Sequence, residues 1–281
     1  MIDVRSFDRL VFAGGGNRCF WQAGVLARWA ELGHRLPADL YGTSAGASIA
    51  ASALTIGPRA ALDHCRRLFA ANERMVDWHD LARARLRFAH QTTYPDWVAQ
   101  IVNADTFTRL REAPQRLWVS VARPATLLGQ RGSVVAATLA YLIDKKVSHS
   151  IHPRLPRFLG LRQQFFALGT SPSVAHAQAV LNAAAGAPPI TPSIHLGGAW
   201  AFDGGYVDNA PVPAQAPDER QRTLVLLTRH YPDRPATFVH QGRQYWQPSR
   251  KVPVSTWNCT HRATVDDAWA LGQEDARRVL G

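Results

Sequence analysis

Apolar and polar residues alternate along the chain in two patterns, and their order predicts an α/β fold. Short apolar runs bounded by polar residues or glycine are typical of strands that are buried on both faces. Longer segments with apolar residues at helical spacing are typical of helices that cover such a sheet. The predicted strands are residues 8–13, 39–41, 116–121, 164–168, 199–202 and 223–228. The predicted helices are residues 20–32, 45–52, 59–71, 173–184 and 264–280.

Cap and turn residues support the ends of several predicted helices. Gly33 follows the first helix, Pro58 suits the first position of the third, and Thr264 suits the N-cap of the last. The first strand, the first helix and the second strand form a βαβ unit. Such units have parallel strands with a right-handed crossover, so we expect a mainly parallel sheet.

Two other stretches have no sustained period. Residues 73–113 contain short helical pieces, which Pro95 and Pro114 are expected to interrupt. Residues 231–258 are polar and aromatic, and we expect them to form loops. The tryptophans and tyrosines between positions 245 and 257 suit packing, and a lipid-docking surface is the alternative.

Residues 132–162 combine an apolar run, residues 134–143, with a basic cluster. Apolar and cationic residues in sequence are typical of interfacial segments, so we predict a cap or a membrane-facing insertion here. A buried helix with a solvated tail is an equal alternative. The cluster consists of Lys145, Lys146, His149, His152, Arg154, Arg157 and Arg162.

Length and composition are those of one globular domain. The chain has 281 residues with 46% hydrophobic content, so we expect residues 1–281 to form a single domain. The three cysteines are widely spaced and fit no zinc pattern, which indicates a reducing compartment. No signal-like or membrane-spanning apolar run is present, so we expect a cytoplasmic protein, peripheral at a membrane at most.

The formal net charge of +11 indicates attraction to polyanions. An anionic membrane surface and nucleic acid are the two candidate partners, and a genome that favours arginine explains the charge equally well. No basic motif with interleaved aromatic residues is present, so we expect no nucleic-acid binding. Transient contact with an anionic membrane surface remains the expected partner interaction.

A candidate nucleophile lies where the second strand meets the second helix. The residues from Gly42 to Gly46 match G-x-S-x-G, the nucleophile elbow, with Ser44 at the tip. Two glycines let the strand and the helix approach closely around the turn. The amide of Ala45 is expected at a helix N-terminus, where unpaired N–H groups favour negative charge. Taken alone, the pentapeptide also fits an ordinary turn of small residues.

A glycine loop follows the first predicted strand. Gly14, Gly15 and Gly16 offer backbone N–H groups without side chains, and Arg18 adds positive charge. The loop lacks the third glycine of a dinucleotide fingerprint, and the chain lacks a Walker sequence. Beside a serine nucleophile, such a loop forms an oxyanion hole. Because a single βαβ step separates this loop from Ser44, the α/β-hydrolase layout does not fit.

A third motif follows the strand at residues 199–202 and begins Asp203-Gly204-Gly205. With the glycine loop and the elbow, it resembles the motifs of the patatin-like phospholipases. The resemblance extends over residues 8–213 and includes the small-residue and proline stretch of residues 182–192. Cys19 departs from it, because the family has a glycine there, and we expect the small thiol to be tolerated.

The resemblance implies a three-layer α/β/α fold and a Ser–Asp catalytic dyad. Ser44 matches the nucleophile and Asp203 the base, while Gly204 and Gly205 complete the proton-acceptor loop. Gly14, Gly15, Gly16 and Arg18 match the oxyanion motif. The implied activity is hydrolysis of phospholipids or other acyl esters, of the phospholipase A or lysophospholipase type, without a metal or cofactor.

Two alternatives stay open from sequence. The fold could serve a non-catalytic lipid- or phosphate-binding protein, or an acyltransferase that uses the same acyl-serine. The dyad is expected to work without histidine. His195 lies nearest to the third motif in sequence, and we interpret it as a loop or surface residue.

Overall fold

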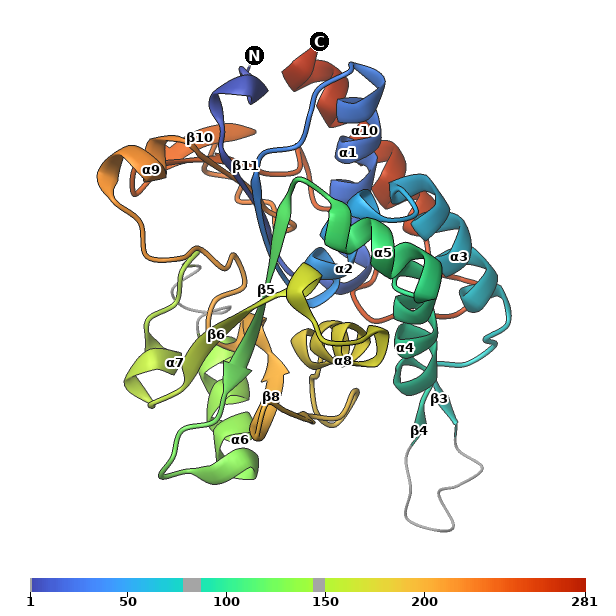
Figure 1. Ribbon diagram of the computed structural model, residues 1–281, viewed down its shortest axis with the longest axis vertical. Coiled ribbons are helices and arrows are strands. Elements are labelled where there is room, and N and C mark those ends of the chain that lie inside the picture. The colour runs from blue at the N-terminus through green and yellow to red at the C-terminus, as the bar shows by residue number, and fades with distance from the viewer. Residues whose placement is uncertain (1, 78–86, 144–149) are drawn as a thin grey trace.

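The computed structural model describes residues 2–77, 87–143 and 150–281. Its main sheet has nine strands in the order β10-β11-β9-β1-β2-β5-β8-β7, with β6 also paired to β5 (Figure 1). The central strands β11, β9, β1, β2 and β5 run parallel. The strands are β1 (Arg9–Phe12), β2 (Asp39–Thr43), β5 (Arg116–Arg123), β6 (Arg162–Ala167), β7 (Ile194–Leu196), β8 (Ala199–Asp203), β9 (Thr223–Leu226), β10 (Thr237–His240) and β11 (Arg243–Trp246). A separate ribbon pairs β3 (Val76–Asp77) with β4 (Arg87–Phe88).

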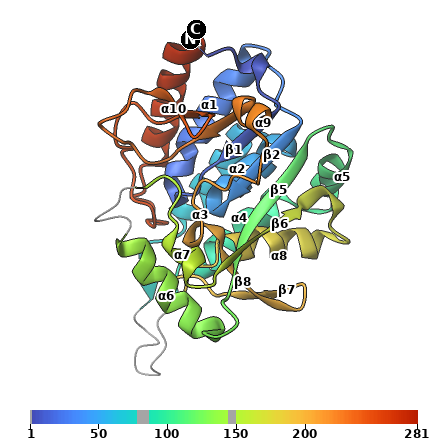
Figure 2. The same cartoon turned by 90° about the vertical axis from the view of Figure 1, so that its left-hand side faces the viewer.

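Helices flank the sheet in a three-layer α/β/α arrangement, as expected (Figures 1 and 2). Leu10, Leu40 and Leu224 share one face of the sheet and join the main hydrophobic core under the larger helical layer. Val11 and Val225 point to the other face, where a smaller core forms. The helices are α1 (Phe20–Glu31), α2 (Ser44–Leu54), α3 (Pro58–Ala70), α4 (His90–Ile101), α5 (Ala104–Glu112), α6 (Gly129–Ile143), α7 (Leu155–Phe158), α8 (Val174–Ala184), α9 (Pro217–Gln221) and α10 (Val265–Leu280).

The predicted strands and helices are confirmed, with shifts at their ends. The expectation that residues 231–258 form only loops is wrong, because β10 and β11 form a hairpin at the edge of the sheet. Gln241 and Gly242 have φ of 49° and 78°, the positive values that a tight hairpin turn requires. Glutamine rarely adopts such a backbone conformation, so the turn has no strong sequence signal.

Two predictions about helix ends are also corrected. Pro95 lies inside α4 and does not interrupt it, because Tyr94 and Trp97 anchor the helix in the core. Thr264 precedes α10, but its hydroxyl donates to the Pro253 carbonyl at 2.7 Å and makes no cap hydrogen bond.

Strand β8 approaches the end of β2 from the opposite direction. Along one edge of β5, β2 pairs as far as Ser120, and β8 pairs from Val121 onward. The other edge of β5 pairs with β6, so β2 and β8 share the first edge. Because β8 is antiparallel to β5, its last residue meets the last residue of β2 end to end. This arrangement brings Asp203 beside Thr43 and the elbow.

The predicted cap or membrane-facing segment contains α6 and α7, on the side of the molecule that faces the viewer in Figure 2. Ala137 of α6 packs with Phe202 and Val207, on either side of the Asp203 loop. Lys145, Lys146 and His149 of the predicted basic cluster lie outside the described residues.

Candidate active site

The elbow between β2 and α2 holds Ser44 in a strained backbone conformation. Its φ of 53° lies in the left-handed region, which costs a non-glycine residue about 1 kcal/mol or more. A Cβ on Gly42 would lie 2.6 Å from Ala47 Cα, and one on Gly46 would lie 2.5 Å from the Ala13 carbonyl oxygen. Only glycine fits at either position, so close packing on both sides of the turn holds Ser44 at its tip.

Asp203 is the carboxylate beside this serine. It is 9% exposed, and its Oδ1 accepts the Gly205 N–H at 2.7 Å. Burial raises the pKa of Asp203 to about 6, while hydrogen bonds from Ser44, Gly205 and Thr43 act in the opposite direction. Within the described chain, no basic side chain forms an ion pair with it. The result is a carboxylate that can take up a proton near neutral pH.

The two glycines after Asp203 make room for this arrangement. A Cβ on Gly204 would lie 2.6 Å from the Ser120 carbonyl oxygen, and one on Gly205 would lie 2.8 Å from Asn209 Oδ1. Larger residues would push the loop away from the end of β2.

Asn209 fastens the first glycine loop to the Asp203 loop. The Gly14 N–H donates to the Asn209 carbonyl at 2.9 Å, and Asn209 Nδ2 donates back to the Gly14 carbonyl at 2.9 Å. The Thr228 hydroxyl donates to the same Gly14 carbonyl. The Gly14 amide is therefore engaged, and Gly14 has a positional role here.

Three other amides of the predicted oxyanion hole have no acceptor among the described residues. They belong to Gly15, Gly16 and Ala45. Gly16 and Ala45 line the same cavity as Ser44. Unpaired N–H groups beside a serine hydroxyl suit a developing negative charge.

Arg18 occupies a different place from the one expected. Its Nε donates to the Gly15 carbonyl at 3.3 Å and so stabilises the glycine loop. The side chain lines a second small cavity with Asn209 and Arg229, and it is not among the residues that line the Ser44 cavity. Burial lowers the pKa of Arg18 from its usual value.

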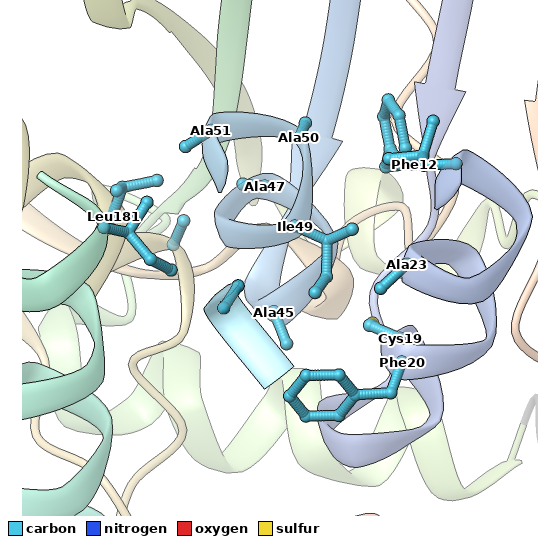
Figure 3. Close-up of a cluster of buried hydrophobic side chains, with 14 of the residues drawn as sticks. Phe12, Cys19, Phe20, Ala23, Ala45, Ala47, Ile49, Ala50, Ala51 and Leu181 are labelled. Atoms are coloured by element: carbon cyan, nitrogen blue, oxygen red, sulfur yellow. The ribbon is translucent and has the colours of Figure 1, made fainter. Parts of the chain in front are cut away.

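The cavity next to Ser44 is narrow and largely apolar. Its volume is about 40 Å³, and Phe20, Ile49 and Trp97 are among its lining residues. Figure 3 shows Phe20 from α1 and Ala45 and Ile49 from α2 pointing toward one another across this region. A bulky group needs these side chains to move apart before it can enter.

A histidine that sequence reasoning missed also lines this cavity. His90 is 9% exposed, packs against Tyr94 and Trp257, and has a buried Nδ1 without a hydrogen-bond partner among the described residues. Burial lowers the pKa of His90 to about 4, so the ring is neutral at pH 7. No sequence signal connects this position in α4 to the elbow.

Of the other residues singled out from sequence, Cys19 lines the Ser44 cavity and His195 does not. His195 is exposed on β7 against Trp200, which agrees with a surface position. Cys19 is buried, its thiol lies 3.6 Å from the Ala13 carbonyl oxygen, and burial raises its pKa. The described residues contain no group of three metal-ligating side chains. None of their helices has the length and apolar character that a membrane crossing requires.

The fold and the site together define a class of α/β protein with a strained serine between a strand and a helix and a buried carboxylate beside it. A sequence model of the patatin-like phospholipase family matches residues 10–215, which include all three motifs. The chain belongs to this family. Membership supports lipid acyl hydrolase activity in general, with lipid esters as substrates. A search of curated proteins finds no match.

Proposed function

We propose that the protein hydrolyses phospholipid or lysophospholipid acyl esters through Ser44 and Asp203. Asp203 accepts the hydroxyl proton as Ser44 Oγ attacks the ester carbonyl carbon. The new oxyanion is held by the amides of Gly15, Gly16 and Ala45, each worth about 3 kcal/mol by comparison with oxyanion donors in other enzymes. The carbon–oxygen bond to the alcohol then breaks, and the alcohol leaves with the proton from Asp203.

The second half of the reaction repeats this chemistry with water. Asp203 takes a proton from a water molecule, whose oxygen attacks the acyl-serine carbonyl. The ester bond to Ser44 breaks, the serine recovers its proton and the fatty acid leaves. An alcohol in place of water would give acyl transfer by the same steps.

The placement of Asp203 beside the strained Ser44 is the observation that carries this proposal. The local pKa values also favour Asp203 as the base over His90, the histidine in the same cavity. The pKa of Asp203 is raised to about 6 and that of His90 is lowered to about 4, so Asp203 binds a proton more tightly. These values support a dyad without histidine.

The direct test incubates a mixed lipid extract with the wild-type protein and with Ser44→Ala, and follows the lipids by mass spectrometry. We expect loss of particular phospholipids and gain of lyso-lipids and fatty acids with the wild type only. The lipids consumed identify the head group and the acyl position. New acylated alcohols in place of fatty acids would identify acyl transfer.

A fluorophosphonate probe tests whether Ser44 is reactive at all. We expect labelling of the wild type and none of Ser44→Ala. His90→Phe and His195→Ala are matched controls that should keep most of the turnover. Absence of labelling in a folded wild-type protein would favour the non-catalytic binding alternative, and an inactive His90→Phe with an active Asp203→Asn would replace the dyad by a serine–histidine pair.

A further inference from the structure

A wide pocket that the proposed reaction does not use lies on the face of the sheet that carries the smaller hydrophobic core. Its volume is about 630 Å³, against about 40 Å³ for the Ser44 cavity. Basic side chains from α7, β6, α9, β11 and the stretch before α7 line it. They are His152, Arg157, Arg162, Arg220 and Arg243.

Only one carboxylate, Asp208, lies among the described residues that line this pocket. Asp208 is 1% exposed and is already occupied, since its oxygens accept from His152 Nδ1 at 2.9 Å and from the Ala210 N–H at 3.0 Å. Arg157 lies 3.7 Å from it. In the part of the chain that the structure describes, Arg162, Arg220 and Arg243 have no acidic partner within salt-bridge distance.

Arg243 shows that this charge is built into the pocket. It is 5% exposed, and its Nε donates to Gln215 Oε1 at 2.7 Å, which fixes the guanidinium. Burial lowers the pKa of Arg243 from its usual value and the neighbouring Arg220 adds to this effect, whereas Tyr245 and Asp208 act in the opposite direction. Burying a guanidinium next to another cation is unfavourable without a counter-charge. Asp208 is a single carboxylate that His152 and Arg157 already engage, so an anionic ligand supplies the remaining counter-charge. Arginine forks suit the oxygens of a phosphate.

Exposed apolar side chains lie on α7, beside the pocket, and on α6. Arg157 lines the pocket, and its neighbour Phe158 on α7 is 83% exposed. Several large apolar side chains of α6 and the turn before it are also exposed. They are Leu127, Leu128, Val135, Leu139, Leu142 and Ile143. A surface of this kind beside basic side chains is typical of proteins that lie on a lipid surface.

The position of α6 connects this surface to the elbow. Its exposed side carries Val135 and Leu139, while its buried side packs on Phe202 and Tyr206, which flank Asp203. Helices α6, α7 and α9 lie on the left of the molecule in Figure 1, which is the side that faces the viewer in Figure 2. Contact of this side with a membrane would place lipid close to the loop of the proposed base.

We propose that the arginine pocket binds the phosphate of an anionic phospholipid while the exposed α6–α7 side chains enter the surface of the bilayer. The proposal deepens the proposed function by naming the docking surface of the enzyme. It does not depend on catalysis, because binding can be measured with Ser44→Ala throughout.

The experiment measures co-sedimentation of Ser44→Ala with vesicles of phosphatidylcholine alone and with added phosphatidylglycerol. Arg162→Gln with Arg220→Gln should weaken binding to the anionic vesicles about tenfold or more, as expected for two basic residues at such a surface. Arg5→Gln with Arg109→Gln is the matched control, because both arginines are exposed, lie outside the pocket and carry the same charge. Equal weakening by both pairs would overturn the pocket in favour of net charge alone.

A second pair of variants tests the apolar surface. Phe158→Ser should weaken binding to both kinds of vesicle several-fold. Val239→Ser, which removes a 69% exposed side chain on β10, should have little effect. An unchanged Phe158→Ser would overturn insertion of the α6–α7 side.

Inorganic phosphate distinguishes a lipid head group from a soluble phosphate compound. Millimolar phosphate should release only a small part of the vesicle-bound protein with an unchanged pocket, because apolar insertion adds to the affinity for lipid. The Arg162→Gln and Arg220→Gln pair could abolish tight binding of phosphate without changing binding to vesicles. That result would show that the pocket binds a soluble phosphate compound and not a lipid head group. Hydrolysis of a soluble short-chain ester should stay unchanged in all pocket variants that retain Ser44, which separates failed docking from failed chemistry.

Discussion

Asp203 and Asp208 belong to one loop and are both buried, yet their surroundings are opposite. Asp203 contacts hydroxyls and an amide beside a narrow apolar cavity. Asp208 is held by His152 and Arg157 at the edge of a wide basic pocket. Burial without a cation produces a carboxylate that can act as a base, whereas burial beside an arginine and a hydrogen-bonding histidine produces a structural anion. Neighbouring charge therefore separates two acids that the motif alone leaves equivalent.

The largest expected effect separates the two acids by activity. Asp203→Asn should lower kcat/KM about 10⁴-fold, because the variant cannot accept the serine proton. Asp208→Asn should keep activity within about tenfold, since it touches no proposed reacting group and its amide oxygen can still accept the Ala210 N–H. Hydrolysis of a chromogenic ester measures both.

The double variant sharpens this result. Ser44→Ala combined with Asp203→Asn should be about as inactive as either single variant, because the two residues act as a unit. An Asp208→Asn as inactive as Asp203→Asn, with the fold intact, would remove the distinction between the two acids.

The pH profile should identify which acid titrates in the reaction. Only ionised Asp203 can accept a proton, and its pKa is raised to about 6. We expect kcat/KM to be constant above that value and to fall about tenfold per pH unit below it. Asp208→Asn should leave this acidic limb at the same pH. A limb that shifts in Asp208→Asn would show that Asp203 is not the group that sets it.

Much of the fold and of the candidate site follows from local sequence. Gly42 and Gly46 mark the elbow because only glycine fits there, and continuous apolar runs mark the central strands. The antiparallel direction of β8 has no local signal, although it is what brings Asp203 to Ser44. Only the resemblance of the three motifs to a known family predicted that Asp203 lies beside Ser44.

The residues that sequence reasoning missed come from separate segments with no shared pattern. His90 reaches the Ser44 cavity from α4, and Arg220 and Arg243 meet across the sheet edge only because of the β10–β11 hairpin. The chain's high net charge is compatible with an anionic partner or with a genome that favours arginine, and it does not indicate which arginines gather. Tertiary contacts decide that.

Asp208 should matter more than Asp203 for the stability of the fold, the reverse of their order in activity. Asp208→Asn removes the charge that holds His152 and Arg157, and it should lower the free energy of unfolding by about 3 kcal/mol. Urea unfolding at neutral pH measures this change. A loss below about 0.5 kcal/mol would show that Asp208 is not a structural anion.

Asp203→Asn should instead stabilise the protein at neutral pH. The folded-state pKa of about 6 lies above the ordinary value of 3.8, so the native state loses stability as the pH rises through this window. Asparagine avoids that loss, and weaker hydrogen bonds offset part of the gain, which leaves about 2 kcal/mol. The advantage should vanish below pH 3.8, where both states of the wild type are protonated. A gain that is independent of pH would contradict this origin.

The smallest expected effect concerns Cys19, which lies close enough to Asp203 for the two groups to influence each other's charge. Burial raises the pKa of this thiol, so it is neutral at the pH of the reaction and adds no charge beside the base. Cys19→Gly should therefore keep kcat/KM within about threefold and leave the acidic limb in place. It should cost about 1 kcal/mol of stability, from the lost packing and from the flexibility of glycine. Loss of activity in a folded variant, or a shifted acidic limb, would mean that the environment of Asp203 depends on the thiol as well as on burial.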